Sequence, residues 1–466
     1  MSHDRPAAAP DPLARRRILV VLFIGVFMAA LDAAVVAPAV PALRHAFGVG
    51  NSQIGMVTIV FSLFSLSSTT LMASLGDRHG RRPIYLLCVA GFALGSLLIA
   101  LAPSFWVVLV GRAIQGFSAG GITPTASAVV GDAFPPAERG KALGMIGATF
   151  GMAFLVGPLV ASLILVTAAW EWIFLINLPV AAVILWIGAR RLPATRAAGP
   201  QAPLDWPGIL IMVVLLSCLV LGINRLLDTT FGLPLWPLML GAAALCVPLL
   251  AAVERRAARP VVPLSLFGTR QLVLTYVLCV GAGFGMGSVI FIASVAVAAL
   301  GVPPKQAGLL LIPLVIASSA GSMVFGRLLN QLGSRLVLLI GFGSLAAGAA
   351  LLALSAAGLL VFMPATVLIG LGVGVVVGGT LRAIVLNEVA PGQRGAAQGL
   401  VNVGISVGNL LVVAALSALA DSQGGGMHGL ITAYLVAAAA MGAMALLSLG
   451  LKPRHAEAVS SAAAQA

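Results

Sequence analysis

The sequence predicts an all-α integral membrane protein. Of its 466 residues, 60% are hydrophobic and only 8% are charged, whereas about a quarter of the residues are charged in soluble domains. Apolar runs of about 20 residues recur along the chain, and a helix of that length crosses about 30 Å of hydrocarbon. The runs lack the alternation of polar and apolar residues that is typical of membrane β-barrels.

Fourteen apolar runs predict fourteen membrane-spanning helices. Their expected bounds are 18–43, 53–75, 84–103, 105–131, 139–167, 172–190, 205–224, 233–253, 271–299, 304–328, 336–355, 359–386, 394–420 and 427–450. Residues 1–17 and 451–466 form polar tails, which lie on the same side because the number of spans is even.

The distribution of Lys and Arg predicts the orientation in the membrane. Of the 26 Lys and Arg residues, 21 fall on the face shared by the two tails, three on the opposite face and two within spans. Positive residues gather on the cytoplasmic side of membrane proteins. We therefore predict cytoplasmic termini in the cell inner (plasma) membrane. The net charge of +13 reflects this topology and not a nucleic-acid partner.

Two loop sequences recur in the second half of the chain. The matched pairs are 73–82 with 326–335, at an offset of 253 residues, and 136–144 with 391–399, at an offset of 255 residues. In the first pair Asp77 is in register with Asn330. Because matched loops lie on the same side of the membrane, the repeat is parallel and divides the chain into similar halves.

The repeat offset leaves room for two spans beyond six. We predict an N-terminal six-helix half at 18–192 and a C-terminal six-helix half at 271–450. The linker 193–270 then carries two extra spans, at about 205–224 and 233–253.

Asp32 is the acid that lies well inside a predicted span. A carboxylate near the bilayer centre costs roughly 2.5–3.5 kcal/mol or more, so it indicates a functional site. Arg112 lies at a similar predicted depth, and Gln115 follows one helical turn later. Opposite buried charges stabilise each other, which favours a switchable proton-coupling pair with Gln115 as substitute partner. A static salt bridge, and helices that turn the two side chains apart, are open alternatives.

These residues resemble the major facilitator superfamily, and more narrowly its 14-span drug–proton antiporter branch, from Ile18 to Leu449. The segment 73–82 is similar to the G-x-L-x-D-x-x-G-R-[KR] signature, with Ala73 in place of the first Gly. Arg112-Ala-Ile-Gln115-Gly116 matches R-x-x-Q-G. Residues 170–179 resemble W-R-W-I-F-x-I-N-x-P, with Glu171 where the family has Arg. The resemblance implies the major facilitator fold, in which two six-helix halves rock around a central site.

Asp77, in the first repeated loop, is a candidate conformational latch. Its carboxylate can cap the unsatisfied N–H groups of a neighbouring helix, and the resemblance implies that this helix starts near Arg394. Arg81 would pair with Asp132, and Gly80 belongs to the same loop. Snorkelling explains the arginines but not the acid.

Span 5 carries glycines that resemble an antiporter helix motif ending in G-P-x-x-G-G. The motif residues are Gly147, Gly151, Gly157 and Pro158. Ala161 and Ser162 replace the closing glycines, so the match is partial. Glycines allow close helix packing and proline allows a bend.

Polar and aromatic residues of two later spans are candidates for lining a central cavity. They are Asn402, Ser406, Asn409, Phe284 and Phe291. The three polar residues share one helical face, which suits either a cavity or a bond between helices. The aromatic residues suit a cavity wall, the core or the lipid. Arg382 and Glu388, at the end of span 12, predict a gate or a snorkelling pair.

We predict a proton-coupled antiporter that exports lipophilic drugs or toxic compounds by alternating access, as a monomer whose partners are protons, a small lipophilic substrate and the bilayer. A transporter of one specific metabolite is an alternative, because the span-5 motif is partial. A membrane enzyme or receptor is disfavoured, because none of the five His residues lies mid-span. No metal or other cofactor is expected, and the four Cys residues form no CxxC pair.

Overall fold

The computed structural model is built of helices. It describes residues 11–49, 51–193, 205–225, 235–257, 260, 262–302, 308–355, 358–390, 393–422 and 427–454, and none of these forms a strand. The first helices are α1 (Pro12–Phe47), α2 (Asn51–His79), α3 (Arg81–Ala100), α4 (Phe105–Ala133), α5 (Pro136–Thr167), α6 (Trp172–Leu175) and α7 (Asn177–Arg191), followed by α8 (Trp206–Arg225) and α9 (Trp236–Glu254). The later elements are η1 (Leu264–Phe267), α10 (Arg270–Ser288), η2 (Val289–Phe291), α11 (Ile292–Leu300), η3 (Gly308–Leu311), α13 (Ile312–Leu332), α14 (Ser334–Ala353), α15 (Leu359–Val375), η5 (Val376–Thr380), α16 (Leu381–Glu388), α17 (Arg394–Ser422) and α18 (Met427–Ser448).

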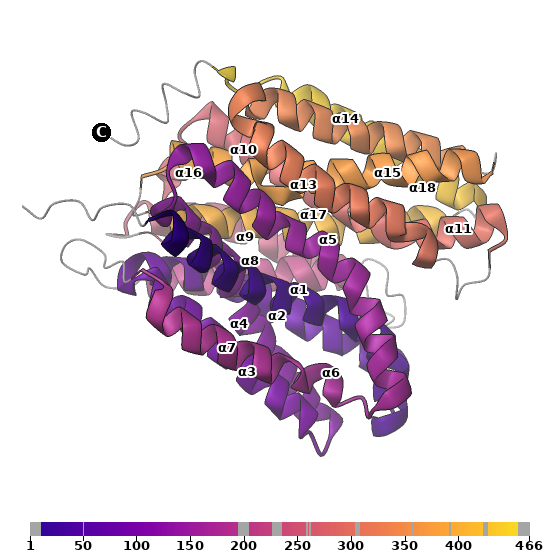
Figure 1. The fold of residues 1–466 in the computed structure, drawn as a ribbon, viewed down its shortest axis with the longest axis horizontal. Helices are drawn as coiled ribbons and strands as arrows, with labels where there is room; N and C mark the ends of the chain where they lie inside the picture. Colours follow the sequence, from indigo (N-terminus) through magenta and orange to yellow (C-terminus); the bar gives the residue numbers. More distant parts are fainter. Residues whose placement is uncertain are drawn as a thin grey trace, which may run out of the picture.

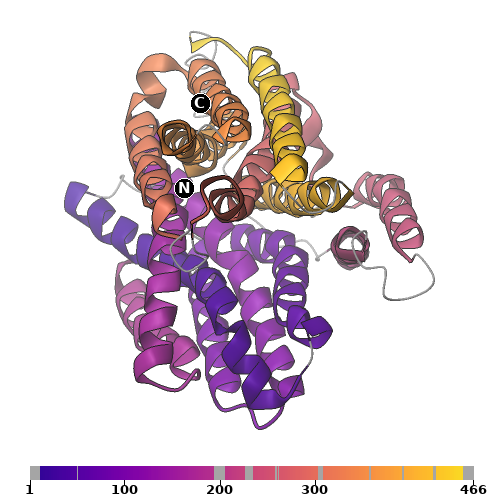
Figure 2. The same ribbon diagram turned by 90° about the vertical axis from the view of Figure 1, so that its right-hand side faces the viewer.

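The helices gather into two bundles that lie side by side (Figures 1 and 2). We call α1–α7 the N-terminal bundle and α10–α18 the C-terminal bundle. The helices α8 and α9 pack against each other, and α8 contacts both α2 and α17. In Figure 2 this pair accordingly lies to one side, beside the junction of the two bundles.

Thirteen helices in the described part of the chain are long and apolar enough to cross a membrane. The helix α5, with 32 residues, is not among those thirteen. The total of fourteen and the division into six, two and six therefore stay predictions. Large apolar side chains on the outside, such as Leu360 at 93% exposure, suit contact with lipid.

Three predicted spans are not regular α-helices throughout. The span expected at 172–190 is irregular at Ile176, between α6 and α7, although the backbone there stays right-handed helical, and the span expected at 271–299 contains the 3₁₀ turn η2. The span expected at 359–386 contains the π-helical turn η5, in which Gly379 has a φ of 147°. A Cβ on Gly379 would lie 2.7 Å from the carbonyl carbon of Leu143, so this backbone rests directly on α5.

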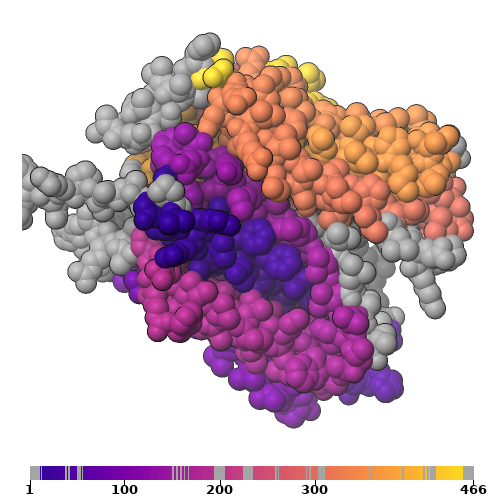
Figure 3. Space-filling model, viewed as in Figure 1, coloured from indigo at the N-terminus to yellow at the C-terminus, as the bar shows by residue number. Residues whose placement is uncertain are grey.

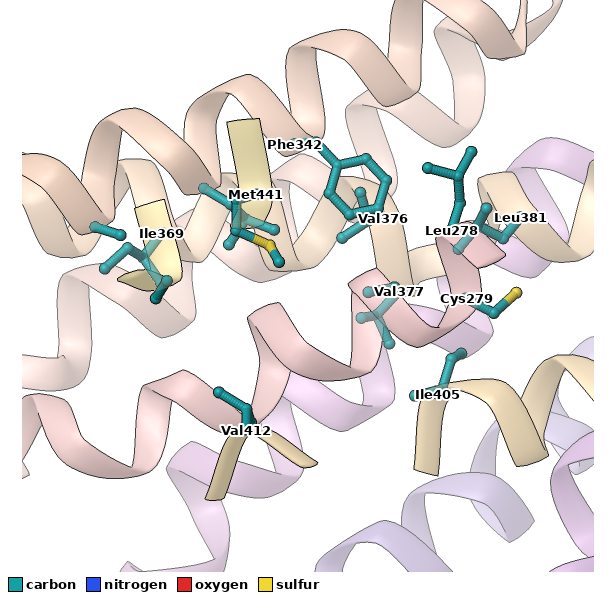
Figure 4. Packing of buried hydrophobic residues seen from close by; sticks show 14 of the residues in the cluster. Leu278, Cys279, Phe342, Ile369, Val376, Val377, Leu381, Ile405, Val412 and Met441 are labelled. Carbon is teal, nitrogen blue, oxygen red and sulfur yellow. The ribbon is translucent and has the colours of Figure 1, made fainter. Parts of the chain in front are cut away.

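Each bundle buries an apolar core. In the C-terminal bundle, Phe342, Met441 and Ile369 belong to one cluster with Leu278 and Val412 (Figure 4). The core of the N-terminal bundle also includes Val375 and Leu386 of the other bundle, so packing is continuous where the bundles meet.

The bundles meet along two seams, where α2 contacts α17 and where α5 contacts α13. We call the end of the molecule where α1 begins and α18 ends the basic end. The hydrogen bonds described between the bundles all lie toward this end. The ribbons of the bundles cross there and diverge toward α6 and α11 (Figure 1), and the surfaces of α5 and α13 touch there (Figure 3).

Candidate functional site

The structure brings Asp32 and Arg112 together inside the N-terminal bundle. Each residue is 1% exposed, and an Nη1–Oδ2 distance of 2.7 Å joins guanidinium to carboxylate. The Oδ1 atom of Asp32 accepts hydrogen bonds from Gln115 Nε2 at 3.2 Å and from Asn177 Nδ2 at 3.0 Å. The carboxylate therefore has three donors, which come from α4 and α7.

Arg112 is held from several sides. Its Nη1 also donates to Gln115 Oε1 at 2.8 Å, and its Nε donates to the carbonyl oxygen of Val57 at 3.3 Å. The guanidinium carbon lies 4.2 Å from the centre of the Phe61 ring, a cation–π contact. The two side chains therefore face each other, which contradicts the alternative in which the helices turn Asp32 and Arg112 apart.

Glycines on α3 and α4 allow these polar groups to meet. A Cβ on Gly95 would lie 2.8 Å from the backbone nitrogen of Gln115, and one on Gly111 would lie 3.0 Å from the carbonyl oxygen of Gly95. The two helices are thus in backbone contact beside the site, as small residues permit in membranes. Ser96, one residue after Gly95, accepts hydrogen bonds from Gln115 at 2.7 Å and from Asn177 at 3.2 Å.

Sequence reasoning missed Asn177 and Ser96 as members of the site. Asn177 stands in the segment that resembles W-R-W-I-F-x-I-N-x-P, and that resemblance was the available signal. Ser96 carries no signal, because a lone serine inside an apolar helix commonly bonds to its own backbone. Its hydroxyl does so here, donating to the carbonyl oxygen of Phe92 at 3.0 Å.

A second polar cluster lies at the basic end, at the α2–α17 seam. The carboxylate of Asp77 accepts hydrogen bonds from the backbone N–H groups of Gly395, at 3.0 Å, and of Ala396, at 3.1 Å. These are the first residues after Arg394, so Asp77 caps the N-terminus of α17. Gly80 forms the turn between α2 and α3 with a φ of 97°, a conformation that side chains disfavour.

Asp132 links two arginines beside this cap. Arg81 forms an ion pair with Asp132 and another with Asp77 at 3.0 Å. Arg394 of the C-terminal bundle forms an ion pair with Asp132 at 2.9 Å and donates to the carbonyl oxygen of Gly131 at 3.0 Å. The four charged residues thus form one network across the seam.

The glycines of span 5 lie where α5 passes close to other helices. A Cβ on Gly147 would lie 2.1 Å from the Cα of Gly378, and one on Gly157 would lie 2.5 Å from the Cβ of Ala34. Gly151 and Pro158 are in α5, but their surroundings fall outside the described residues.

The candidate cavity residues separate into different environments. Asn402 accepts a hydrogen bond from Arg382 at 2.6 Å, next to the junction of the bundles. Asn409 instead faces α10, since a Cβ on Gly287 would lie 2.4 Å from its Oδ1. Phe284 and Phe291 pack against the C-terminal core. Ser406 is partly buried and has no hydrogen bond among those described.

The predicted pairing of Arg382 with Glu388 is wrong. Arg382 is 3% exposed and bonds to Asn402 and, at 3.5 Å, to Ser127 of the N-terminal bundle. Glu388 is held by Lys452, with Nζ–O distances of 2.7 and 2.8 Å. The prediction was based on the closeness of the two residues in the sequence. It failed because their side chains bond to different neighbours, Arg382 to Asn402 and Glu388 to Lys452.

Comparison with known proteins places the chain in a family. The model described as Major Facilitator Superfamily matches residues 22–298 and 275–465. The chain belongs to the Major Facilitator Superfamily. It is thus a multi-pass membrane transporter, and relatives named for drug or antibiotic resistance place it in the drug-efflux branch of the superfamily.

Individual members of the superfamily show the extent of the similarity. The chain is 34% identical over 391 residues to the MFS-type transporter YfiU of Bacillus subtilis, and the matched region covers 82% of this chain and 75% of that protein. It is 31% identical over 401 residues to the puromycin resistance protein pur8 of Streptomyces alboniger, covering 84% and 79%. The human organic anion transporter MFSD10 (TETRAN) superposes with a TM-score of 0.72 at 18% identity, over 94% of this chain and 100% of that one, which shows a shared fold.

Proposed function

We propose that this superfamily member is a proton-coupled antiporter that exports lipophilic compounds across the inner membrane by alternating access. The observation that supports the proposal is the fully buried Asp32–Arg112 pair with its neutral partners Gln115 and Asn177. An ionised carboxylate at this depth is costly, and acids of this kind mark ion and proton pathways.

The chemistry of the pair permits a switch. When Asp32 gains a proton it loses its charge, and Arg112 keeps neutral acceptors in Gln115 Oε1 and the Val57 carbonyl oxygen. Loading and release of one proton therefore change the charge of the site while Arg112 stays hydrogen-bonded. A static buried salt bridge would also need these neutral partners, so the two alternatives differ in how transport responds to removal of the carboxylate.

Coupling requires that proton and substrate favour different conformations. We place the basic end in the cytoplasm, following the distribution of Lys and Arg. The latch of Asp77, Arg81, Asp132 and Arg394 then closes the cytoplasmic side in this conformation. Proton loading of Asp32 from the outside would favour the return to the inward-facing form. The membrane potential supplies about 2.3 kcal/mol per charge per 100 mV.

The test is export by proteoliposomes with an imposed pH gradient and a panel of lipophilic dyes. The wild type should move dye against its gradient. Asp32→Asn should reduce the rate of pH-driven transport at least about tenfold, because a pH difference of one unit supplies about 1.4 kcal/mol for each coupled proton and the variant cannot use it. Glu138→Gln is the matched control, since it removes a surface carboxylate that is 48% exposed.

Equal pH-driven transport by wild type and Asp32→Asn would refute the proposed coupling. Dye movement that continues unchanged after the gradient is collapsed would refute antiport altogether. Transport of one metabolite and of no dye would favour the alternative of a specific carrier.

A further inference from the structure

A cavity of about 320 Å³ lies at the basic end, at the α5–α13 seam. It lies between the start of α5 and the C-terminal bundle, which Figure 1 shows side by side near α16. Its walls include Arg139, Asn330, Asn387, Gln271 and Arg454. None of these residues takes part in the latch or in the Asp32 cluster.

The cavity occupies the position that the sequence repeat pairs with the latch. The offset of 253 residues matches Asp77 with Asn330, and the offset of 255 matches Arg139 with Arg394 and Asp132 with Asn387. The backbone agrees with this match, since Gly80 and Gly333 both start a helix with positive φ, at 97° and 78°. The two seams are therefore structural counterparts.

The two carboxylates of the latch are amides in the cavity. Where Asp77 accepts hydrogen bonds from the N-terminus of α17, Asn330 Nδ2 donates to the carbonyl oxygen of Ala137, at 2.7 Å. Where Arg394 meets the carboxylate of Asp132, Arg139 meets the amide oxygen of Asn387, at 3.2 Å. No side chain caps the N-terminus of α5, and within the described residues Arg139 has no ion pair.

Other groups around the cavity are donors too. Gln271 is 3% exposed, and its Nε2 has no hydrogen-bond partner among the described residues. The helix α14 begins beside the cavity at Ser334, so a second helix N-terminus adds positive potential. The acid that lines the cavity, Glu388, is already bound by Lys452. The cavity thus offers several cationic and N–H donors. Two of them, Arg139 and the N-terminus of α5, correspond to groups that hold carboxylates in the latch.

We propose that this cavity binds a phosphate-type oxyanion, which takes the place of the missing carboxylates and fastens α5 to the C-terminal bundle. The anion is either free inorganic phosphate or the headgroup of an anionic phospholipid, because the cavity opens at the basic end of the molecule. Guanidinium and helix N-termini are the groups that bind such oxyanions. The inference depends only on the contact between α5 and the C-terminal bundle around this cavity. It does not depend on the direction of transport or on its coupling to protons.

The experiment measures thermal unfolding of the purified full-length protein in maltoside micelles, which contain no phosphate. One arm titrates inorganic phosphate against chloride at equal ionic strength. The other arm titrates phosphatidic acid against diacylglycerol with the same acyl chains. A saturable rise in unfolding temperature in either arm is expected, since a ligand that binds the folded state stabilises it, and the arm that responds identifies the source.

Two variants test the location. Arg139→Gln removes a donor, and Asn387→Asp restores the carboxylate that the latch has at this position, so each should raise the apparent dissociation constant at least tenfold. Arg327→Gln, an exposed arginine of α13 that does not line the cavity, should respond as the wild type does. The lack of a saturable response in both arms would overturn the inference, and so would an undiminished response in folded Asn387→Asp. Neither result bears on proton coupling, because no gradient or substrate is present.

Discussion

At the scale of single residues, Asp32 illustrates how the partners of a buried carboxylate are supplied inside an apolar span. Arg112 supplies the countercharge, and Gln115 and Asn177 supply neutral hydrogen bonds to the second oxygen. Hydrogen bonds to a charged group contribute about 1.5–3 kcal/mol each. The neutral partners therefore contribute to the stability of the buried pair along with the countercharge.

We predict that Asn177→Leu slows pH-driven transport about tenfold, because proton release must re-form a carboxylate that has lost one donor worth about 1.5 kcal/mol. Initial rates of dye transport in proteoliposomes check this. Ser96→Ala should have a smaller effect, since Ser96 bonds to Gln115 and Asn177 but not to the carboxylate itself. A larger loss in Ser96→Ala than in Asn177→Leu would contradict this account.

The sequence was sufficient to find charged members of the site and insufficient to find neutral ones. Asp32 and Arg112 stand out because a charge within an apolar run is costly and rare. Asn177 and Ser96 carry little cost in a helix and follow no spacing rule, so only the folded arrangement reveals their contact with the charged pair. Arg382 stood out as well, but its hydrogen-bond partners come from two other helices, α4 and α17, and no local pattern specifies them.

At the scale of elements, the end of α2 closes on the beginning of α17. The carboxylate of Asp77 satisfies two backbone N–H groups that the helix cannot satisfy itself, at the positive end of the helix dipole. Such an arrangement favours the conformation in which the two helix ends meet.

We predict that Asp77→Asn weakens this closed conformation by about 0.3–2 kcal/mol, because the charge at the dipole is lost and the amide can accept at one atom only. Transport should fall severalfold while membrane insertion and yield stay as in the wild type. Transport rates per inserted molecule measure the effect. Wild-type rates from Asp77→Asn would show that the network is structural and does not act as a latch.

The positions of the helices follow from hydropathy, whereas their irregularities do not. Apolar runs indicated spans at 172–190, 271–299 and 359–386, and each of them departs from a regular α-helix at one place. Hydropathy depends on the free energy of exposing side chains to water. It does not indicate which backbone hydrogen bonds form. The turn η5 exists where Gly378 and Gly379 rest on α5, which is a tertiary contact between residues far apart in the sequence.

At the scale of the whole molecule, the contacts at the basic end hold the two bundles together, and the proposed alternating access would require these contacts to open. The position of Ala73 on α2 and of Gly399 on α17 allows a direct test. A Cβ on Gly399 would lie 3.3 Å from the Cβ of Ala73, close to the range of about 3.5–4.5 Å found in disulfides.

We predict that the double variant Ala73→Cys with Gly399→Cys loses transport on oxidation and recovers it on reduction, because the cross-link prevents the seam from opening. Dye transport before and after each treatment is the measurement. Each single variant controls for the four native cysteines, Cys88, Cys218, Cys246 and Cys279. Full transport by a quantitatively cross-linked protein would exclude motion at this seam.

The repeat in the sequence indicated two related halves, and the division of the chain into these halves stays a prediction. The place of α8 and α9 was not predictable, because uniformly apolar helices present no face that specifies a neighbour. The structure resolves this through Ile209, Met212 and Leu216 of α8, which cluster with Leu66 of α2 and with Val403 of α17.

That position of α8 has a consequence for the surrounding bilayer. In the proposed alternating-access cycle, a helix that touches both sides of the α2–α17 seam can follow only one of them, so the other side would exchange contacts with α8 for contacts with acyl chains. Since helix association in lipid depends on packing and not on a hydrophobic force, this exchange costs little free energy but requires lipid tails to reorder. If the proposed cycle operates, the order and length of the acyl chains would therefore affect the rate of each transport cycle, and turnover would depend on the composition of the membrane.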